Sequence, residues 1–90
     1  MNGSLQWNME ELQNAYNKLG DCITQLKEYV EKCEKSNEEL KKSWVTTKSA
    51  SYFEEASKVK TDALKMINEY ENAREQLRQK IEILRTMDEE

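Results

Sequence analysis

The 90-residue sequence has no proline and no histidine, and it contains only two glycines and two cysteines. The shortage of glycine and proline makes tight β-turns and glycine-rich phosphate loops very unfavourable, which argues against an all-β fold or a nucleotide-binding loop. Histidine is the commonest general base and metal ligand, and two cysteines cannot supply the four ligands of a structural zinc ion. We therefore expect no metal, no cofactor and no catalytic triad.

Basic charge and long apolar runs are also scarce. Acidic residues outnumber basic residues by 18 to 14, giving a net charge of −4, whereas nucleic-acid binding requires a basic surface. No apolar run approaches the roughly 20 residues that span a bilayer, and residues 1–11 lack the regions of a signal peptide. We expect protein partners, no nucleic acid and no stable membrane insertion.

The sequence does contain a heptad pattern of apolar residues. In the first half, apolar residues recur in alternating steps of three and four, which predicts a helix over about residues 8–44. Asn8 and Glu11 have the spacing of a capping box and are expected to start this helix. Its expected packing residues include Leu12, Tyr16, Leu19, Ile23, Leu26, Val30, Cys33 and Trp44.

The second half repeats the pattern less regularly and predicts another helix over about residues 51–88, interrupted by Lys80. Residues 45–50 are rich in β-branched and hydroxyl side chains, which favour a bend. Ser51 and Glu54 could cap the second helix, and Thr47 or Ser49 could serve equally well. The packing residues expected on this helix include Tyr52, Val59, Met66, Tyr70, Leu77 and Leu84.

Two helices of similar length joined by a short link predict a single all-α domain over residues 1–90, folded as an antiparallel hairpin. One hairpin buries one stripe per helix, which rarely offsets the entropy of ordering a chain of this size. A further flank of the first helix, which includes Cys22 and Tyr29, is uncharged, while Phe53, Ile67 and Ile81 widen the second stripe. We therefore expect each hairpin to dimerise with another into a four-helix bundle, as a homodimer or a heterodimer.

The sequence offers no convincing catalytic group. Cys22 and Cys33 lie about 16 Å apart on a straight helix, so both are expected to be reduced, and Cys33 is expected to be buried and inert. Glu54, Glu55 and the acidic residues 88–90 are interpreted as solvated charges on helix faces. The chain is therefore expected not to be an enzyme.

Two residues near the bend allow alternative interpretations. Asn37 occupies an apolar position of the heptad and is either a buried amide that sets the register or a polar residue at a solvated helix end; we favour the second, because residues 36–39 are polar. Trp44 is either a plug that closes the end of the hairpin or a recognition residue whose ring is partly exposed, and the physical arguments for the two are equal.

Trp44 stands at the expected bend, Tyr52 follows it by eight residues, and the small residue Ala50 lies between them. This segment resembles the WXG family of small type VII secretion proteins. Members form helical hairpins of about 100 residues with Trp-x-Gly at the bend and an aromatic residue eight positions after the Trp. Thr46 stands where the family has glycine, which is a departure from the defining motif.

The resemblance implies a dimeric four-helix bundle that leaves the cytoplasm through a membrane ATPase and becomes secreted. Family members combine the bend motif with a Tyr-x-x-x-Asp/Glu signal after the second helix. Here Tyr70 is followed four residues later by Arg74, and only Leu84 and Asp88 keep the spacing, with leucine in place of the aromatic residue. This pair is either a weak variant or a coincidence, and we favour coincidence.

The expected function is therefore that of a non-enzymatic WXG-like protein of type VII secretion. It would be a secreted substrate, or a targeting partner or chaperone for a larger effector toxin that carries a related helical amino-terminal domain. The alternative is a cytoplasmic coiled-coil scaffold or assembly chaperone with no role in secretion. The expected recognition residues are Trp44, Val45, Thr46 and Tyr52 and, more weakly, Leu84 and Asp88.

Overall fold

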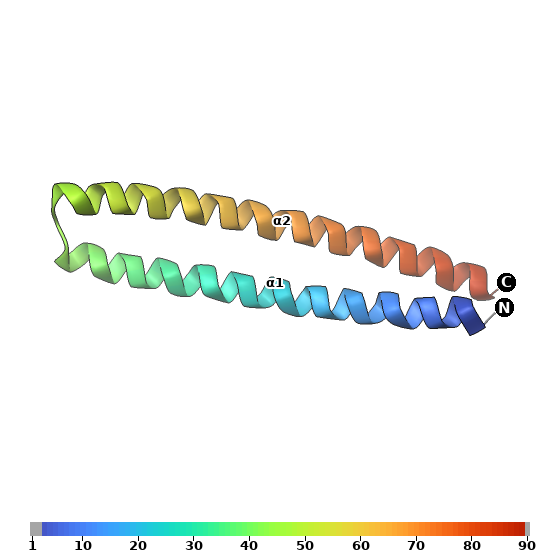
Figure 1. The fold of residues 1–90 in the computed structure, drawn as a ribbon. Helices are drawn as coiled ribbons and strands as arrows, with labels where there is room; N and C mark the ends of the chain where they lie inside the picture. Colours follow the sequence, from blue (N-terminus) through green and yellow to red (C-terminus); the bar gives the residue numbers. More distant parts are fainter. Residues whose placement is uncertain (1–2, 90) are drawn as a thin grey trace. The chain divides into compact units, whose positions relative to one another are not determined.

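The computed structural model describes residues 3–89, which form two long α-helices and no strand. Helix α1 spans Gly3–Ser43 and helix α2 spans Thr47–Glu89 (Figure 1). The chain divides into two compact units, Met1–Ile23 with Glu69–Glu90, called the end unit below, and Thr24–Asn68, called the bend unit. In each unit a segment of α1 lies antiparallel to a segment of α2, so the expected all-α helical hairpin is confirmed.

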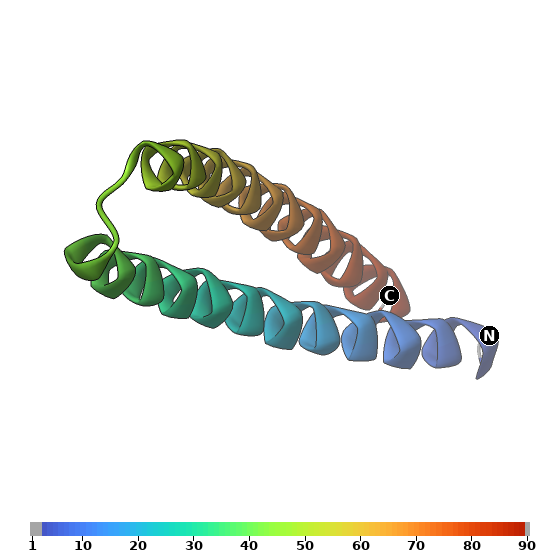
Figure 2. The ribbon, with the colours of Figure 1, turned by 60° about the vertical axis from the view of Figure 1, so that its left-hand side comes forward.

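The bend unit contains the connection between the helices, which is short in both views (Figures 1 and 2). Its core is formed by buried Ile67 and by half-buried apolar residues, namely Leu26, Val30, Phe53, Ala56 and Ala63. The aliphatic stem of Lys60 lies at the edge of this core. Its ammonium group forms an ion pair with Glu34 across the two helices. The pair is partly exposed and therefore contributes little to stability, but it joins α1 to α2.

In the end unit, Ile23 of α1 and Ile81 of α2 are buried. In the same unit, Arg74 of α2 reaches across to α1, where its Nε donates a hydrogen bond of 3.0 Å to the backbone oxygen of Tyr16. The same guanidinium lies 3.9 Å from the centre of the Tyr16 ring. Gly20 makes room for this arrangement, because a Cβ atom there would lie 2.5 Å from Arg74 Nη2.

The helix boundaries differ from those expected. Helix α1 begins at Gly3, so Asn8 and Glu11 lie inside the helix and do not start it. Helix α2 begins at Thr47, four residues before the expected cap at Ser51. The bend is accordingly limited to residues 44–46, and the expectation of a bend over 45–50 was too long.

A capping box at Thr46 and Ser49 explains where α2 begins. The Ser49 backbone N–H donates to Thr46 Oγ1 at 3.1 Å, and the Thr46 N–H donates to Ser49 Oγ at 2.8 Å. The Ser49 hydroxyl also donates to the Thr46 backbone oxygen at 2.8 Å, and Ser49 is buried. Serine here takes the part usually played by Glu or Gln at the third helical position, which satisfies two backbone donors at the helix start.

The side of α2 that packs on α1 also differs from the expected stripe. In the bend unit the buried and half-buried residues of α2 are Ser49, Phe53, Ala56, Lys60, Ala63 and Ile67. Val59 and Met66, which were expected on this stripe, are 64% and 47% exposed. The packing stripe passes through Phe53, Lys60 and Ile67 because the stem of Lys60 is apolar enough to lie at the helix interface.

Candidate functional site

Three aromatic rings gather where the chain turns from α1 to α2. The Trp44 ring lies 5.5 Å from the Tyr52 ring and 6.0 Å from the Phe53 ring, measured between centroids. Tyr52 and Phe53 are themselves 5.1 Å apart at an angle of 79°. These separations and tilted geometries are those that aromatic pairs prefer, so the three residues form one cluster, called the aromatic cluster below.

The bend positions the aromatic cluster by its length and by its cap. The Trp44 backbone N–H donates to the Leu40 oxygen at 2.9 Å, so Trp44 directly follows the last turn of α1. The capping box at Thr46 and Ser49 then fixes the start of α2, which brings Tyr52 and Phe53 into its second turn. No residue within 3–89 has a positive φ angle, so this short bend is made without the conformation that favours glycine.

The aromatic cluster is partly buried and partly presented to solvent. Trp44 and Phe53 are half-buried, whereas Tyr52 is 42% exposed and Val45, at the tip of the bend, is 84% exposed. Trp44 thus contacts the hairpin end without being enclosed by it. The geometry of the Trp44 ring is therefore compatible with both interpretations, a plug of the hairpin end and a recognition residue.

Two polar side chains of α1 border the aromatic cluster. The Tyr52 hydroxyl donates a hydrogen bond of 2.9 Å to Asn37 Oδ1 on α1, and the Lys41 ammonium lies 5.4 Å from the centre of the Phe53 ring. Asn37 is half-buried within a continuous helix and bonded to the other helix. Neither interpretation of Asn37 describes it fully, because its amide links the two helices while the hydrogen bond is exposed to solvent.

The expected recognition residues do not all lie together. Trp44, Val45, Thr46 and Tyr52 belong to the bend and the aromatic cluster, although the Thr46 side chain is engaged in capping α2. Leu84 is half-buried in the end unit. The side chain of Asp88 lies outside the described residues, so the weak Leu84 and Asp88 signal stays a prediction. Three residues lie at the site although they were not expected there, namely Asn37, Lys41 and Phe53. Their only sequence signal was that they lie near the bend in the sequence.

The expected packing residues divide into two groups. On α1 and α2, those that are buried or half-buried are Leu12, Tyr16, Leu19, Ile23, Leu26, Val30, Ile67, Leu77 and Leu84. Those that are exposed are Tyr29, Val59, Met66 and Tyr70. Contact of the second group with another chain stays a prediction.

The two cysteines are free, and both are exposed. The expectation that Cys33 is buried was wrong, because the packing side of α1 in the bend unit passes through Val30, Glu34 and Asn37. Cys33 lies at the edge of that side. Its place in the heptad, beside half-buried residues, explains why the sequence pattern misplaced it.

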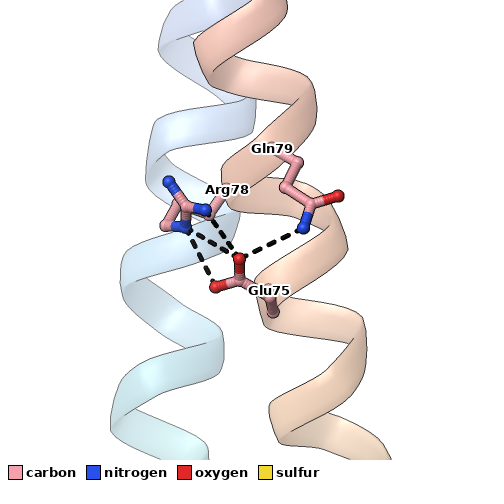
Figure 3. Close-up of polar contacts among 3 residues, drawn as sticks. All are labelled: Glu75, Arg78 and Gln79. Atoms are coloured by element: carbon pink, nitrogen blue, oxygen red, sulfur yellow. Dashed lines mark hydrogen bonds and ion pairs between the residues drawn. The ribbon is translucent and has the colours of Figure 1, made fainter.

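Glu75 has the opposite character from a catalytic acid, because its pKa is lowered. Glu75 accepts hydrogen bonds from Arg78 Nε at 2.9 Å and from Arg78 Nη2 at 2.6 Å, and one from Gln79 Nε2 at 3.3 Å (Figure 3). Hydrogen bonding from Arg78 lowers the pKa of Glu75, and the same bond raises the pKa of Arg78. A general acid near neutral pH needs a raised carboxyl pKa, so Glu75 is a solvated ion-pair residue.

Other kinds of site find little support in the part of the chain that the structure describes. Among residues 9–87, whose side chains the structure describes, no three cysteine, aspartate or glutamate side chains are arranged to hold a metal ion. Neither helix over residues 3–89 carries an apolar stretch that would reach across a bilayer. Comparison of the chain with protein-family models, curated proteins and solved structures gave no match in any of the three.

Proposed function

We propose that this chain is a non-enzymatic, WXG-like protein of type VII secretion that acts through protein contacts, either as a secreted substrate or as the targeting partner of a larger effector. The observation that carries the proposal is the aromatic cluster, in which Trp44 is held at the bend of a helical hairpin with part of its ring accessible. A partly exposed tryptophan is the kind of residue that dominates binding energy at protein interfaces.

The position of Thr46 removes the main objection to the resemblance. Thr46 is the N-cap of α2, and threonine and glycine are both accepted at that position. The bend contains no positive φ angle, so its backbone does not require glycine at residue 46. Threonine can therefore stand in place of the family's glycine while the hairpin bend and the position of Trp44 are kept.

Assembly with a second hairpin is part of the proposal. Among residues 9–87, the apolar side chains that are buried are Ile23, Ile67 and Ile81. This core is small compared with what is needed to offset the conformational entropy that the backbone loses on folding. Burial against a partner hairpin would enlarge the core. The partner is either a second copy or the helical amino-terminal domain of an effector, and the secretion ATPase is the proposed receptor of the complex.

The experiment that tests the proposal measures export and partner capture in a type VII-secreting strain. Trp44→Ala should abolish export or partner binding while the hairpin stays helical. The matched control is Ser49→Ala, which weakens the same bend by removing a cap but leaves all three rings in place. If both variants lost export in proportion to their loss of stability, a recognition role for Trp44 would be contradicted.

A second arm of the experiment asks whether the chain is exported alone. Since no Tyr-x-x-x-Asp/Glu element is present, we expect export only together with a partner that supplies it. Leu84→Ala and Asp88→Ala test whether their spacing carries a signal. Efficient export of the chain alone, unchanged by either substitution, would favour a self-sufficient substrate. A stable bundle with no export under any condition would favour the scaffold or assembly chaperone.

A further inference from the structure

The bend carries a positive charge that the rest of the chain does not have. Residues 41–53 contain three lysines, Lys41, Lys42 and Lys48, and no acidic residue. All 18 acidic residues lie elsewhere, and the chain as a whole has a net charge of −4. Positive charge is therefore concentrated at one place in an acidic chain, where it attracts groups of negative charge.

The three lysines lie at the same end of the bend unit. Lys41 and Lys42 belong to the last turn of α1, and Lys48 belongs to the first turn of α2. Residues 44–46 alone connect these two turns, which are therefore neighbours (Figures 1 and 2). All three lysine side chains are exposed. Their charges are thus presented together at the bend.

Apolar and aromatic side chains lie among these lysines. The Lys41 ammonium lies 5.4 Å from the centre of the Phe53 ring, which places it beside the aromatic cluster. Tyr52 of that cluster is 42% exposed, and Val45 is 84% exposed. The surface at this end is called the basic tip below, and it consists of Lys41, Lys42, Trp44, Val45, Lys48 and Tyr52.

Acidic residues border the basic tip but do not neutralise it. Residues 38–39 precede the tip on α1, and residues 54–55 follow it on α2. Glu38 precedes Lys42 by four residues, which is the spacing of an ion pair along a helix. Nevertheless, among the side chains that the structure describes, neither Lys42 nor Lys48 forms an ion pair. These two charges are therefore available to a partner.

Lys48 is placed against the dipole of its own helix. The amino-terminal end of a helix carries a partial positive charge, so acidic residues are stabilising there and a lysine is not. The first turn of α2 contains no acidic residue. Lys41 and Lys42, by contrast, complement the partial negative charge at the carboxyl end of α1. Helix stability therefore does not account for the charge of Lys48, and a carboxylate from a partner would offset its repulsion.

We propose that the basic tip binds an acidic segment of a partner protein, in which Asp or Glu residues flank an apolar or aromatic side chain. The carboxylates contact the lysines, and the apolar side chain packs against Trp44, Val45 and Tyr52. The inference rests on the recognition role of Trp44 in the proposed function and adds the chemical class of the partner. Because the chain is acidic elsewhere, charge directs such a segment to the tip.

A membrane surface fits the basic tip less well than an acidic protein segment does. Clusters that bind anionic lipids usually contain about four to eight basic residues, whereas the tip contains three. The net charge of −4 also opposes the approach of the chain to an anionic bilayer. An acidic protein segment is therefore the occupant that the charges favour.

Fluorescence anisotropy of the full chain with a panel of labelled peptides tests the proposal. Each peptide carries a central Leu, Phe or Tyr flanked by Asp and Glu, and a matched copy carries Asn and Gln instead. The acidic peptides should bind at least about tenfold more tightly than their copies. The difference should shrink as salt is added, because exposed charges are screened. Equal binding of the two sets would overturn the proposal.

Lys48→Gln and Lys65→Gln are matched variants for the location of the site. Both remove one exposed positive charge from α2, but Lys65 lies about 25 Å from Lys48 along the helix. Lys48→Gln should weaken binding of the acidic peptides roughly threefold to fivefold, and combining it with Lys42→Gln should weaken binding roughly tenfold. Lys65→Gln should change binding less than about 1.5-fold. Equal losses with Lys48→Gln and Lys65→Gln would contradict binding at the tip.

Thermal unfolding followed by circular dichroism separates binding from folding. Lys48→Gln removes a cation from the positive end of the helix dipole, so this variant should melt at the wild-type temperature or slightly above it. Weaker peptide binding by a variant that is at least as stable as wild type cannot come from loss of the fold. If Lys48→Gln lowered the melting temperature together with binding, Lys48 would be a structural residue and the proposal would be contradicted.

Further outcomes distinguish this inference from the proposed function. Export that requires Trp44 but is unchanged by the combined Lys42→Gln and Lys48→Gln substitutions would overturn the acidic segment and leave the proposed function in place. Peptide binding that needs Lys48, in a chain whose export ignores Trp44, would support the basic tip and contradict the proposed function. Binding through Lys48 to vesicles of phosphatidylcholine and phosphatidylserine, with no preference for acidic peptides, would replace the protein segment by a membrane surface.

Discussion

The Arg74 guanidinium lies 3.9 Å from the centre of the Tyr16 ring and donates a hydrogen bond to the backbone oxygen of the same residue. A single arginine thus contacts both the ring and the main chain of one residue on the facing helix. The contact requires a glycine one turn further along α1, because a side chain at residue 20 would occupy the space of the guanidinium.

Gly20→Ala should reveal this dependence. Alanine improves the intrinsic helix propensity by about 1 kcal/mol, but its Cβ displaces the flexible end of Arg74 from Tyr16. Loss of a cation–π contact and a charged hydrogen bond costs about 2–4 kcal/mol, so we expect net destabilisation of about 1–3 kcal/mol in urea unfolding.

A double-mutant cycle provides the control for Gly20→Ala. In an Arg74→Ala background there is no guanidinium to displace, and Gly20→Ala should then stabilise the chain by about 1 kcal/mol. The same effect in both backgrounds would show that Gly20 is not required by Arg74.

Trp44→Ala should reduce stability by about 1–2 kcal/mol, which is less than the 3–5 kcal/mol of a fully buried aromatic residue. The reason is that the ring is half-buried and has contacts with Tyr52 and Phe53 on one side. Chemical unfolding followed by circular dichroism measures the change. Val45→Ala, at an 84% exposed position, is the control and should stay within about 0.5 kcal/mol of wild type. A loss above about 4 kcal/mol for Trp44→Ala would identify the ring as a structural plug.

Ser49→Ala should destabilise the hairpin by about 1–2 kcal/mol, because it leaves the Thr46 N–H without the hydroxyl that accepts its hydrogen bond. Ser51→Ala, at the position that the sequence pattern favoured as the cap, should change the free energy of unfolding by less than about 0.5 kcal/mol. Thermal unfolding of the two variants side by side distinguishes the caps. The reverse order of effects would mean that α2 begins at Ser51.

Glu75 should titrate below its ordinary pKa of 4.5, because Arg78 hydrogen-bonds to the ionised form. A pKa that is lower in the folded chain stabilises it above the unfolded pKa, and this contribution is lost as the pH falls through the folded value. NMR titration of the Glu75 carboxyl measures the midpoint. Arg78→Ala should move the midpoint up towards 4.5, and Gln79→Ala should move it less. A midpoint that ignores Arg78→Ala would contradict the assignment.

The heptad pattern predicted the hairpin because apolar residues dominate the packing positions of α1. Ile23 and its neighbours Leu19 and Leu26 lie where the steps of three and four placed them.

On α2 the pattern was right at Leu77 and Leu84. It was one position early at Val59 and Met66, since Lys60 and Ile67 occupy the places that face α1. Arg74 faces α1 as well. The long stems of Lys60 and Arg74 are apolar although their ends are charged, and a pattern based on residue type counts them as surface residues.

The details of the bend could not be predicted for a different reason. Residues 46–51 contain four hydroxyl side chains, and several of them have the spacing to cap a helix. The buried position of Ser49 selects one pair, and burial depends on tertiary packing. The aromatic cluster depends in turn on this choice, because moving the start of α2 by one residue rotates Tyr52 and Phe53 by about 100° relative to Trp44.

The cross-helix contacts also imply an order of folding. Asn37 and Tyr52 are 15 residues apart in sequence, Glu34 and Lys60 are 26 apart, and Tyr16 and Arg74 are 58 apart. Closing a loop costs more entropy as the loop lengthens, so contacts near residues 44–46 form at the lowest cost. The contacts near the bend should therefore form before those near the chain ends. In stopped-flow measurements, Ser49→Ala should lower the folding rate, whereas Arg74→Ala should mainly raise the unfolding rate.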